Sequence, residues 1–201
     1  MLGHGGAPTN SRGRPRDPAI DDAILRSALS VLTAEGYQAM TIEGVAAEAG
    51  VGRPTVYRRF ASKADLVSAA LARVSAGEDP DLPSSSRPAL LALMRITARS
   101  LATTEAMVLV GSLLAEAGRD PSLVVACRER VFGPRIAQVR RLLSKGIAAR
   151  ELVPGADDEA TVDLLFGALL ARSMLGEPLD EAWLERVVAT AMAGIAAEAR
   201  S

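Results

Sequence analysis

Aromatic residues are scarce in this chain, because Phe, Trp and Tyr together make up only 3% of its 201 residues. Strands are normally enriched in aromatic and β-branched side chains. Ala, Leu, Arg and Glu, which are abundant here, favour helices instead. Since 49% of the residues are hydrophobic and 23% are charged, the chain can still bury a core. The composition therefore predicts an all-α globular protein.

Cysteine and histidine each occur once, as Cys127 and His4. A lone cysteine cannot form an internal disulfide, and the helical, apolar context of Cys127 predicts a small buried side chain. His4 lies in a polar terminal segment, so no folded histidine is available for catalysis with Ser or Cys, and no cluster has zinc spacing. We therefore expect no enzyme activity, no metal and no cofactor.

Long apolar runs are missing as well. The longest, near residues 106–115, has about half the length that a membrane-spanning helix needs. The first residues lack the apolar core of a signal peptide. These features predict a cytoplasmic protein with no membrane partner.

Composition divides the chain into four segments. Residues 1–17 are rich in Gly, Pro, Ser and Arg, which predicts a flexible basic tail. Helical periodicity covers residues 18–76, prolines and serines predict a linker at 77–87, and helical periodicity returns over 88–201.

Glycine and proline mark the expected helix ends. In the first helical segment, Gly36 should stop a helix that begins at Pro18. In the second, Pro134 should kink or split the longest helix. The helices of this second segment are expected at about 88–103, 105–117, 121–149, 158–174 and 180–198.

Positive charge is concentrated in one short stretch of a chain whose formal net charge is −1. Residues 53–63 contain four basic side chains and no acidic one. The first 76 residues carry nine basic and seven acidic residues, whereas the rest carries 14 and 17. Only the N-terminal part therefore suits a polyanion. Charge alone leaves open a solvated helix face, which is what most basic runs are.

The predicted helices at 41–49 and 53–60 are joined by a glycine-containing turn, which is the sequence form of a helix-turn-helix. Val56 and Phe60 lie four residues apart and should face inward, which leaves a polar face exposed to a DNA major groove. The stretch MTIEGVAAEAGVGRPTVYRRFASKADL, Met40 to Leu66, resembles the DNA-binding motif of the TetR/AcrR family of transcriptional regulators.

This resemblance implies a three-helix DNA-binding domain followed by a larger helical domain for dimerisation and ligand binding. One departure is Gly52, where the family commonly has a capping Ser whose hydroxyl could touch DNA. The resemblance assigns phosphate contacts to three residues and base-reading positions to three more, and the helical wheel adds Arg58 to the exposed face. The expected DNA contacts are Thr41, Tyr57 and Lys63 at phosphates, and Arg53, Pro54, Thr55 and Arg58 on the exposed face.

The expected function is transcriptional repression. One recognition helix covers too few base pairs for genomic specificity, so a homodimer on a pseudo-palindromic operator is expected. The resemblance also implies release by a small apolar ligand. The alternative is a helical ligand-binding or scaffolding protein without specific DNA recognition.

The tail contains RGRPR, residues 12–16, which resembles the AT-hook core that lies in the minor groove of A·T-rich DNA. Arginine side chains are attracted to the strong negative potential of that groove. A basic tail could instead add only non-specific attraction. The residues concerned are Arg12, Arg14 and Arg16.

The C-terminal part is less informative. Long or aromatic side chains between residues 88 and 174 could line an apolar ligand pocket, although each could equally be core. They are Met94, Met107, Leu113, Phe132 and Phe166. By resemblance, the last two helices would form a four-helix bundle with a second copy, the alternative being that their apolar stripes are intramolecular core. The dimerisation candidates are Val162, Phe166, Leu169, Trp183, Val187, Ala191 and Ile195.

Overall fold

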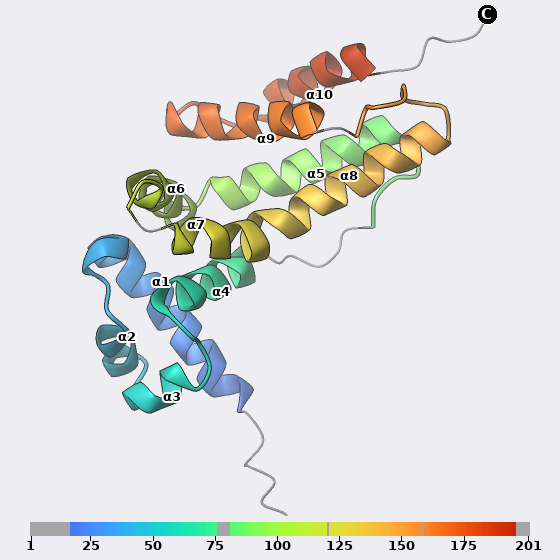
Figure 1. Ribbon diagram of the computed structural model, residues 1–201. Coiled ribbons are helices and arrows are strands. Elements are labelled where there is room, and N and C mark those ends of the chain that lie inside the picture. Colours follow the sequence, from blue (N-terminus) through green and yellow to red (C-terminus); the bar gives the residue numbers. More distant parts are fainter. Residues whose placement is uncertain (1–16, 76–80, 120, 158, 196–201) are drawn as a thin grey trace, which may run out of the picture.

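The computed structural model describes residues 17–75, 81–119, 121–157 and 159–195 (Figure 1). In these ranges the regular elements are helices, and no β-strand occurs among them. The all-α prediction is therefore confirmed. The elements are α1 (Pro18–Ala39), α2 (Ile42–Glu48), α3 (Arg53–Tyr57), α4 (Lys63–Ser75), α5 (Ser86–Leu101), α6 (Thr104–Glu116), α7 (Ser122–Cys127), the π-helical turn η1 (Arg128–Phe132), α8 (Gly133–Ala148), α9 (Glu159–Met174) and α10 (Glu181–Ile195).

The first helix begins and ends where its sequence predicts. Asp17 accepts a hydrogen bond from the backbone N–H of Ala19, and Pro18 occupies the first turn. Gly36 has φ 77° and interrupts the helical backbone, a conformation that glycine adopts without steric cost. The short segment after it turns back so that Tyr37 and Met40 are buried.

The four N-terminal helices share a core with two helices from further along the chain. Their buried side chains include Ile24, Val45 and Leu66, and the same cluster contains Leu123 and Cys127 of α7. Cys127 is fully buried, as predicted, and this burial raises the pKa of its thiol to about 12. The four N-terminal helices are thus packed directly on α6 and α7.

A second core lies among α5, α8, α9 and α10. Figure 1 shows α5 and α8 side by side, with α9 and α10 covering them on the side away from α1. Leu90, Leu143 and Leu169 are fully buried there. The aliphatic stripes seen in the sequence thus become the interior of a helical bundle.

The disturbance predicted at Pro134 takes the form of a widened turn rather than a break. Gly133 donates its backbone N–H to the carbonyl of Arg128, five residues back. Pro134 has no N–H to continue the α-helical pattern. A Cβ atom on Gly133 would lie 2.7 Å from the carbonyl oxygen of Arg128, so only glycine fits this turn as it is built.

No helix in the described ranges is both long and apolar enough to cross a membrane.

Candidate nucleic-acid interface

The second helix is held at both ends by local sequence signals. Thr41 caps α2, its hydroxyl accepting a hydrogen bond from the N–H of Gly44 at 3.0 Å. Gly50 has φ 66° and turns the chain, and the N–H of Val51 then bonds to the carbonyl of Ala46 at 2.9 Å. This tight turn sets the direction in which α3 begins.

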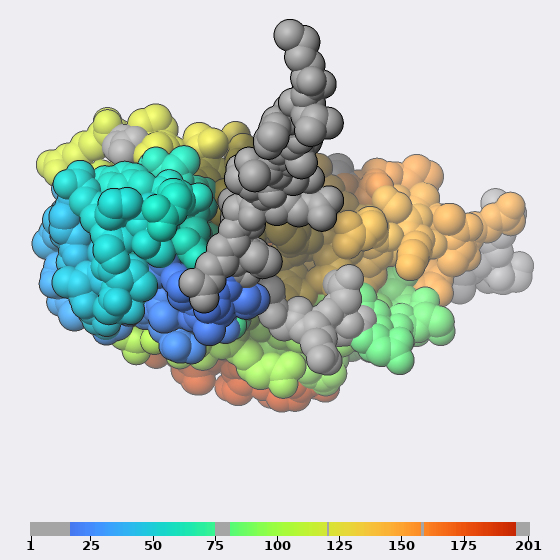
Figure 2. Space-filling view, turned by 90° about the horizontal axis from the view of Figure 1, so that it is seen from below, coloured from blue at the N-terminus to red at the C-terminus, as the bar shows by residue number. Residues whose placement is uncertain are grey.

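The third helix presents one face to solvent. Val56 and Phe60 are buried beneath it, as their four-residue spacing predicts. Arg53, Pro54 and Arg58 are exposed. Figure 2 views the molecule from the end at which α2 and α3 lie, where the blue-to-cyan atoms of the N-terminal helices form one lobe.

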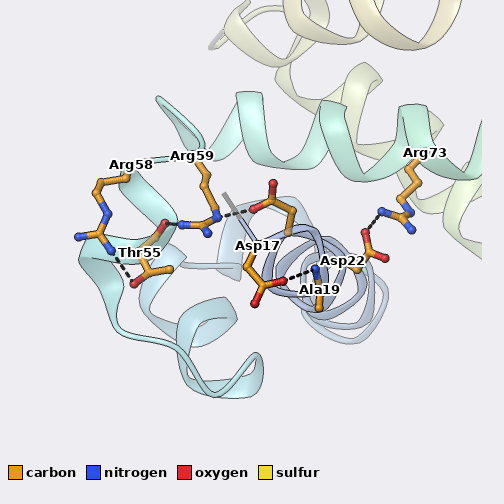
Figure 3. Close-up of polar contacts among 8 residues, drawn as sticks. Asp17, Ala19, Asp22, Thr55, Arg58, Arg59 and Arg73 are labelled. Carbon is orange, nitrogen blue, oxygen red and sulfur yellow. Dashed lines mark hydrogen bonds and ion pairs between the residues drawn. The ribbon is translucent and has the colours of Figure 1, made fainter. Parts of the chain in front are cut away.

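Two ion pairs fasten α3 and α4 to α1 (Figure 3). Arg59 donates to the carboxylate of Asp21 and also to the carbonyl of Thr55 at 3.2 Å. Arg73 of α4 pairs with Asp22 in the same way. Arg59 thus has a structural role that the sequence did not predict. Its position three residues after Val56, on the buried side of the helix, is the signal that could have revealed it.

The exposed side chains of α3 are partly organised already. Arg53 pairs with Glu43 of α2 at 2.7 Å and its guanidinium lies 5.3 Å from the ring centroid of Tyr57. The hydroxyl of Thr55 accepts a hydrogen bond from Arg58 at 3.1 Å. The hydrogen bond that Arg53 donates to Tyr57 and the charge of Glu43 raise the pKa of Arg53. Two of the predicted base-reading side chains, Arg53 and Thr55, therefore already have partners on this surface.

Two of the predicted phosphate contacts have other partners in this structure. The hydroxyl of Thr41 is the α2 cap, and the ammonium of Lys63 contacts backbone carbonyls at the end of α1. Tyr57 is 44% exposed and its ring is available to a nucleic acid. The tail residues Arg12, Arg14 and Arg16 lie outside the described residues.

The start of α4 is capped by its own side chains. Ser62 accepts the N–H of Asp65 at 3.0 Å, and the Asp65 carboxylate accepts the N–H of Ala61 at 2.8 Å. Arg130 of the π-helical turn forms an ion pair with the same carboxylate. The C-terminal part of the chain therefore touches the N-terminal helices at the first turn of α4.

A cavity of about 790 Å³ lies between α4, α5, α6, the π-helical turn, α8 and α9. Leu113, Phe132 and Phe166, three of the candidate ligand-binding residues, line it. Met94 is not among the lining residues, because it is 1% exposed inside the bundle core. Met107 lines a separate cavity of about 550 Å³. Met94 therefore takes the core alternative, and Met107 stays a candidate lining residue at this second cavity.

Two members of the predicted dimerisation stripe face inward. Val162 and Leu169 are 2% and 0% exposed in the protomer's own core, so a partner cannot reach them. The other predicted members are only partly buried and pack against that core: Phe166, Trp183, Val187, Ala191 and Ile195. The intramolecular alternative is therefore correct for Val162 and Leu169.

A different stripe of the same helices faces outward. On α9 it contains Leu164, which is 71% exposed, together with Gly167 and Ala171. On α10 it contains the exposed small residues Ala189 and Ala193. The residues predicted for dimerisation are instead those that the chain uses for its own packing. The described residues contain no group of His, Cys, Asp and Glu side chains suited to hold a metal ion.

Comparison with known proteins agrees with this arrangement. Residues 24–70 match the family described as bacterial regulatory proteins, tetR family, and residues 79–191 match the Tetracyclin repressor-like C-terminal domain. The chain belongs to the TetR family. It is a DNA-binding transcriptional regulator and not an enzyme.

Individual relatives extend over nearly the whole chain. An uncharacterized HTH-type transcriptional regulator of Bacillus subtilis, YdeS, is 31% identical over 94% of this chain and 96% of its own length. A TetR transcriptional regulator from Agrobacterium tumefaciens has the same fold, with a TM-score of 0.73 at 23% identity over 91% of this chain and 97% of that one. The regulator FadR of Bacillus subtilis, solved in complex with stearoyl-CoA, gives 0.66 at 20% identity over 86% and 98%.

Proposed function

We propose that this TetR-family regulator is a homodimeric repressor that binds a pseudo-palindromic operator and is released by a small, largely apolar ligand. In this proposal residues 18–76 form the DNA-binding domain, and residues 77–87 link it to the second domain. Residues 88–201 form that second domain, with the dimer surface and the ligand cavity. Binding to chromosomal DNA places it in the cytoplasm. The observation that carries the proposal is the exposed face of α3, where Arg53, Thr55 and Arg58 lie together.

DNA recognition by this face follows from its chemistry. A guanidinium can donate two hydrogen bonds to a guanine edge, and a hydroxyl can meet several base edges. Arg53 is paired with Glu43 only at the surface, both side chains being more than half exposed, so a base can replace the carboxylate. The basic tail, by its sequence, adds affinity at A·T-rich flanks.

Dimerisation is proposed through the outward stripe of α9 and α10. Leu164 is largely exposed, and the small residues Gly167, Ala171, Ala189 and Ala193 let a second pair of helices approach closely. The proposal requires the two-fold axis of this dimer to run so that both copies of α3 can meet one operator. Leu164→Glu should produce monomers in light scattering, whereas Val125→Glu, which alters an exposed apolar residue of α7, should not.

Release by a ligand is supported by what lines the cavity. Leu71, Ala72 and Val74 of α4 form part of its wall, opposite side chains of α6 and α9. Most of the lining is aliphatic or aromatic, which favours an apolar ligand body. A ligand shifts the equilibrium only by binding the DNA-incompetent arrangement more tightly. The stearoyl-CoA bound by FadR and the repressor-like C-terminal match support this type of regulation.

The deciding experiment is selection of duplexes from a random pool at physiological salt, followed by titration of the selected site. The proposal expects an inverted repeat bound by two chains. It is wrong if no duplex competes better than bulk DNA. A thermal-shift screen of apolar compounds, with hits titrated against the complex, tests release separately. A ligand that binds the cavity tightly and leaves DNA affinity unchanged would contradict release by a ligand. It would leave the proposed DNA binding intact.

A further inference from the structure

Lys63 stands where a lysine is electrostatically unfavourable. It is the first residue of α4, and the first turn of a helix carries the positive end of the helix dipole, which favours acidic side chains. A cation kept at this position needs compensation from elsewhere in the molecule.

The compensation lies at the end of α1. The Lys63 ammonium donates to the carbonyls of Tyr37 at 2.8 Å, Met40 at 3.2 Å and Gln38 at 3.4 Å. The same nitrogen lies 4.4 Å from the centroid of the Tyr37 ring, close enough for a cation–π interaction. An ammonium has three N–H donors, and three carbonyls surround this one.

These carbonyls lie at the C-terminal end of α1, where the helical backbone is already interrupted at Gly36. The last carbonyls of a helix commonly accept hydrogen bonds from donors outside that helix. The last turn of α1 contains no basic residue of its own. A cation at a helix C-terminus is favourable, and Lys63 supplies it from another helix.

The contact joins the two ends of the helix-turn-helix. Met40 immediately precedes Thr41, the cap of α2, and Lys63 begins the helix that follows α3. The unit from α2 to α3 is therefore enclosed between the carbonyls and the ammonium. On the far side, Gln38 also donates to Glu116 of α6, a carboxylate that is 4% exposed. The end of α1 that holds Lys63 is thus itself fixed to α6 through Gln38 and the buried Glu116.

We infer that Lys63 is a positioning residue, which holds the start of α2 against the start of α4 instead of neutralising a DNA phosphate. This inference rests on the proposed DNA-binding function only where affinity for a duplex is measured. The structural role of Lys63 is tested on the protein without DNA.

The test compares Lys63→Met, which keeps most of the aliphatic stem and removes the ammonium, with Arg58→Gln, which removes an exposed cation of α3. Two quantities are measured: the Tm of the free protein, and the slope of log affinity for the selected duplex against log salt. Lys63→Met should lower Tm by roughly 3–10 °C and weaken binding by the same factor at every salt concentration. Arg58→Gln should change Tm by less than about 2 °C and make the slope shallower by about 0.9 if Arg58 meets one phosphate.

Hydrogen exchange gives a readout that needs no DNA. The amides of residues 40–45 should exchange faster in Lys63→Met than in the parent protein, while those of α9 should not change. If Lys63→Met does not fold, Lys63→Arg is measured instead; because it keeps the cation, it should retain the exchange protection and the parent salt slope.

A shallower salt slope in either Lys63 variant overturns the inference, because it means that the ammonium meets a phosphate. Unchanged Tm and exchange in Lys63→Met overturn it as well. Failure of the parent protein to prefer any duplex would count against the proposed function alone, and the Tm and exchange effects of Lys63→Met would still be expected.

Discussion

Arg130, in the wall of the large cavity, forms an ion pair with Asp65 in the first turn of α4. The same carboxylate accepts the N–H of Ala61, in the segment that joins α3 to α4. Val131 and Phe132 of the same π-helical turn also line the cavity. A ligand that displaces the π-helical turn therefore acts on Asp65 through Arg130. Asp65 caps the start of α4, the helix that follows α3.

Replacing Arg130 with Gln should uncouple the cavity from DNA with little loss of stability. The pair is partly exposed, and such pairs contribute about 0–1 kcal/mol, so Tm should fall by no more than about 4 °C. The concentration of a cavity ligand needed to release the selected duplex should rise several-fold. Arg128→Gln, on the exposed side of the same turn, is the control. Equal release curves for the parent and Arg130→Gln would show that the ion pair carries no coupling.

Gly133 should resist even the smallest substitution. A methyl group there would lie 2.7 Å from the Arg128 carbonyl oxygen, and the backbone must shift to relieve the clash. Gly133→Ala should therefore destabilise the protein by about 1–3 kcal/mol. Gly111→Ala is the matched control in α6, because no atom lies within 4 Å of its Cβ position. The control should stabilise by about 0.5–1 kcal/mol, since alanine favours helices, and chemical denaturation measures both. A neutral Gly133→Ala would mean that the turn relaxes to an ordinary α-helix without cost.

The sequence predicted the helices well because their signals are local. Gly36 stops α1, and Thr41 caps α2, through atoms only a few residues away. The partners of long side chains were not predictable in this way. Lys63 was assigned to phosphate by resemblance, yet its partners lie 23 to 26 residues earlier. Leu164 was passed over because an apolar helix position does not state whether it faces its own core or a second chain.

The stability of the protein should fall as the pH drops below about 4.5. Arg95 binds the carboxylate of Glu181, with Nε at 3.0 and 2.9 Å from its two oxygens, and this lowers the pKa of Glu181 from 4.5. The N–H of Ser86 lowers the pKa of Glu151 from the same value. A carboxyl whose pKa is lowered by folding takes up protons more readily when unfolded. The contribution of such a carboxyl to the free energy of unfolding is complete above pH 4.5. It is lost as the pH falls through the folded-state pKa.

Thermal melts between pH 6 and pH 3 test this assignment. The parent protein should lose Tm steadily below about pH 4.5, and the double variant Glu151→Gln, Glu181→Gln should lose less over the same range. Glu48→Gln, an exposed residue of α2, should follow the parent curve. Parallel curves for the double variant and the parent would place the acid sensitivity in other carboxyls.

Glu43 restrains Arg53 on the surface that should meet DNA. Its carboxylate lies 2.7 Å from the Arg53 guanidinium, so a base must compete with it, and its charge repels phosphates. Glu43→Gln should therefore raise the affinity for every duplex by roughly 3–10-fold, corresponding to about 1 kcal/mol. Because the pair is exposed, Tm should change by less than about 4 °C.

Glu48→Gln separates the two causes of that gain. Glu48 is another exposed acid of α2, so removing its charge should also help binding in low salt, and this gain should shrink as salt increases. Part of the Glu43→Gln gain should persist at high salt, because Arg53 no longer has to exchange partners. The measurement is fluorescence anisotropy on the selected duplex and on a scrambled one across a range of salt. Identical salt dependence for the two variants would show that Glu43 acts only as a surface charge and that the contact with Arg53 has no part in recognition.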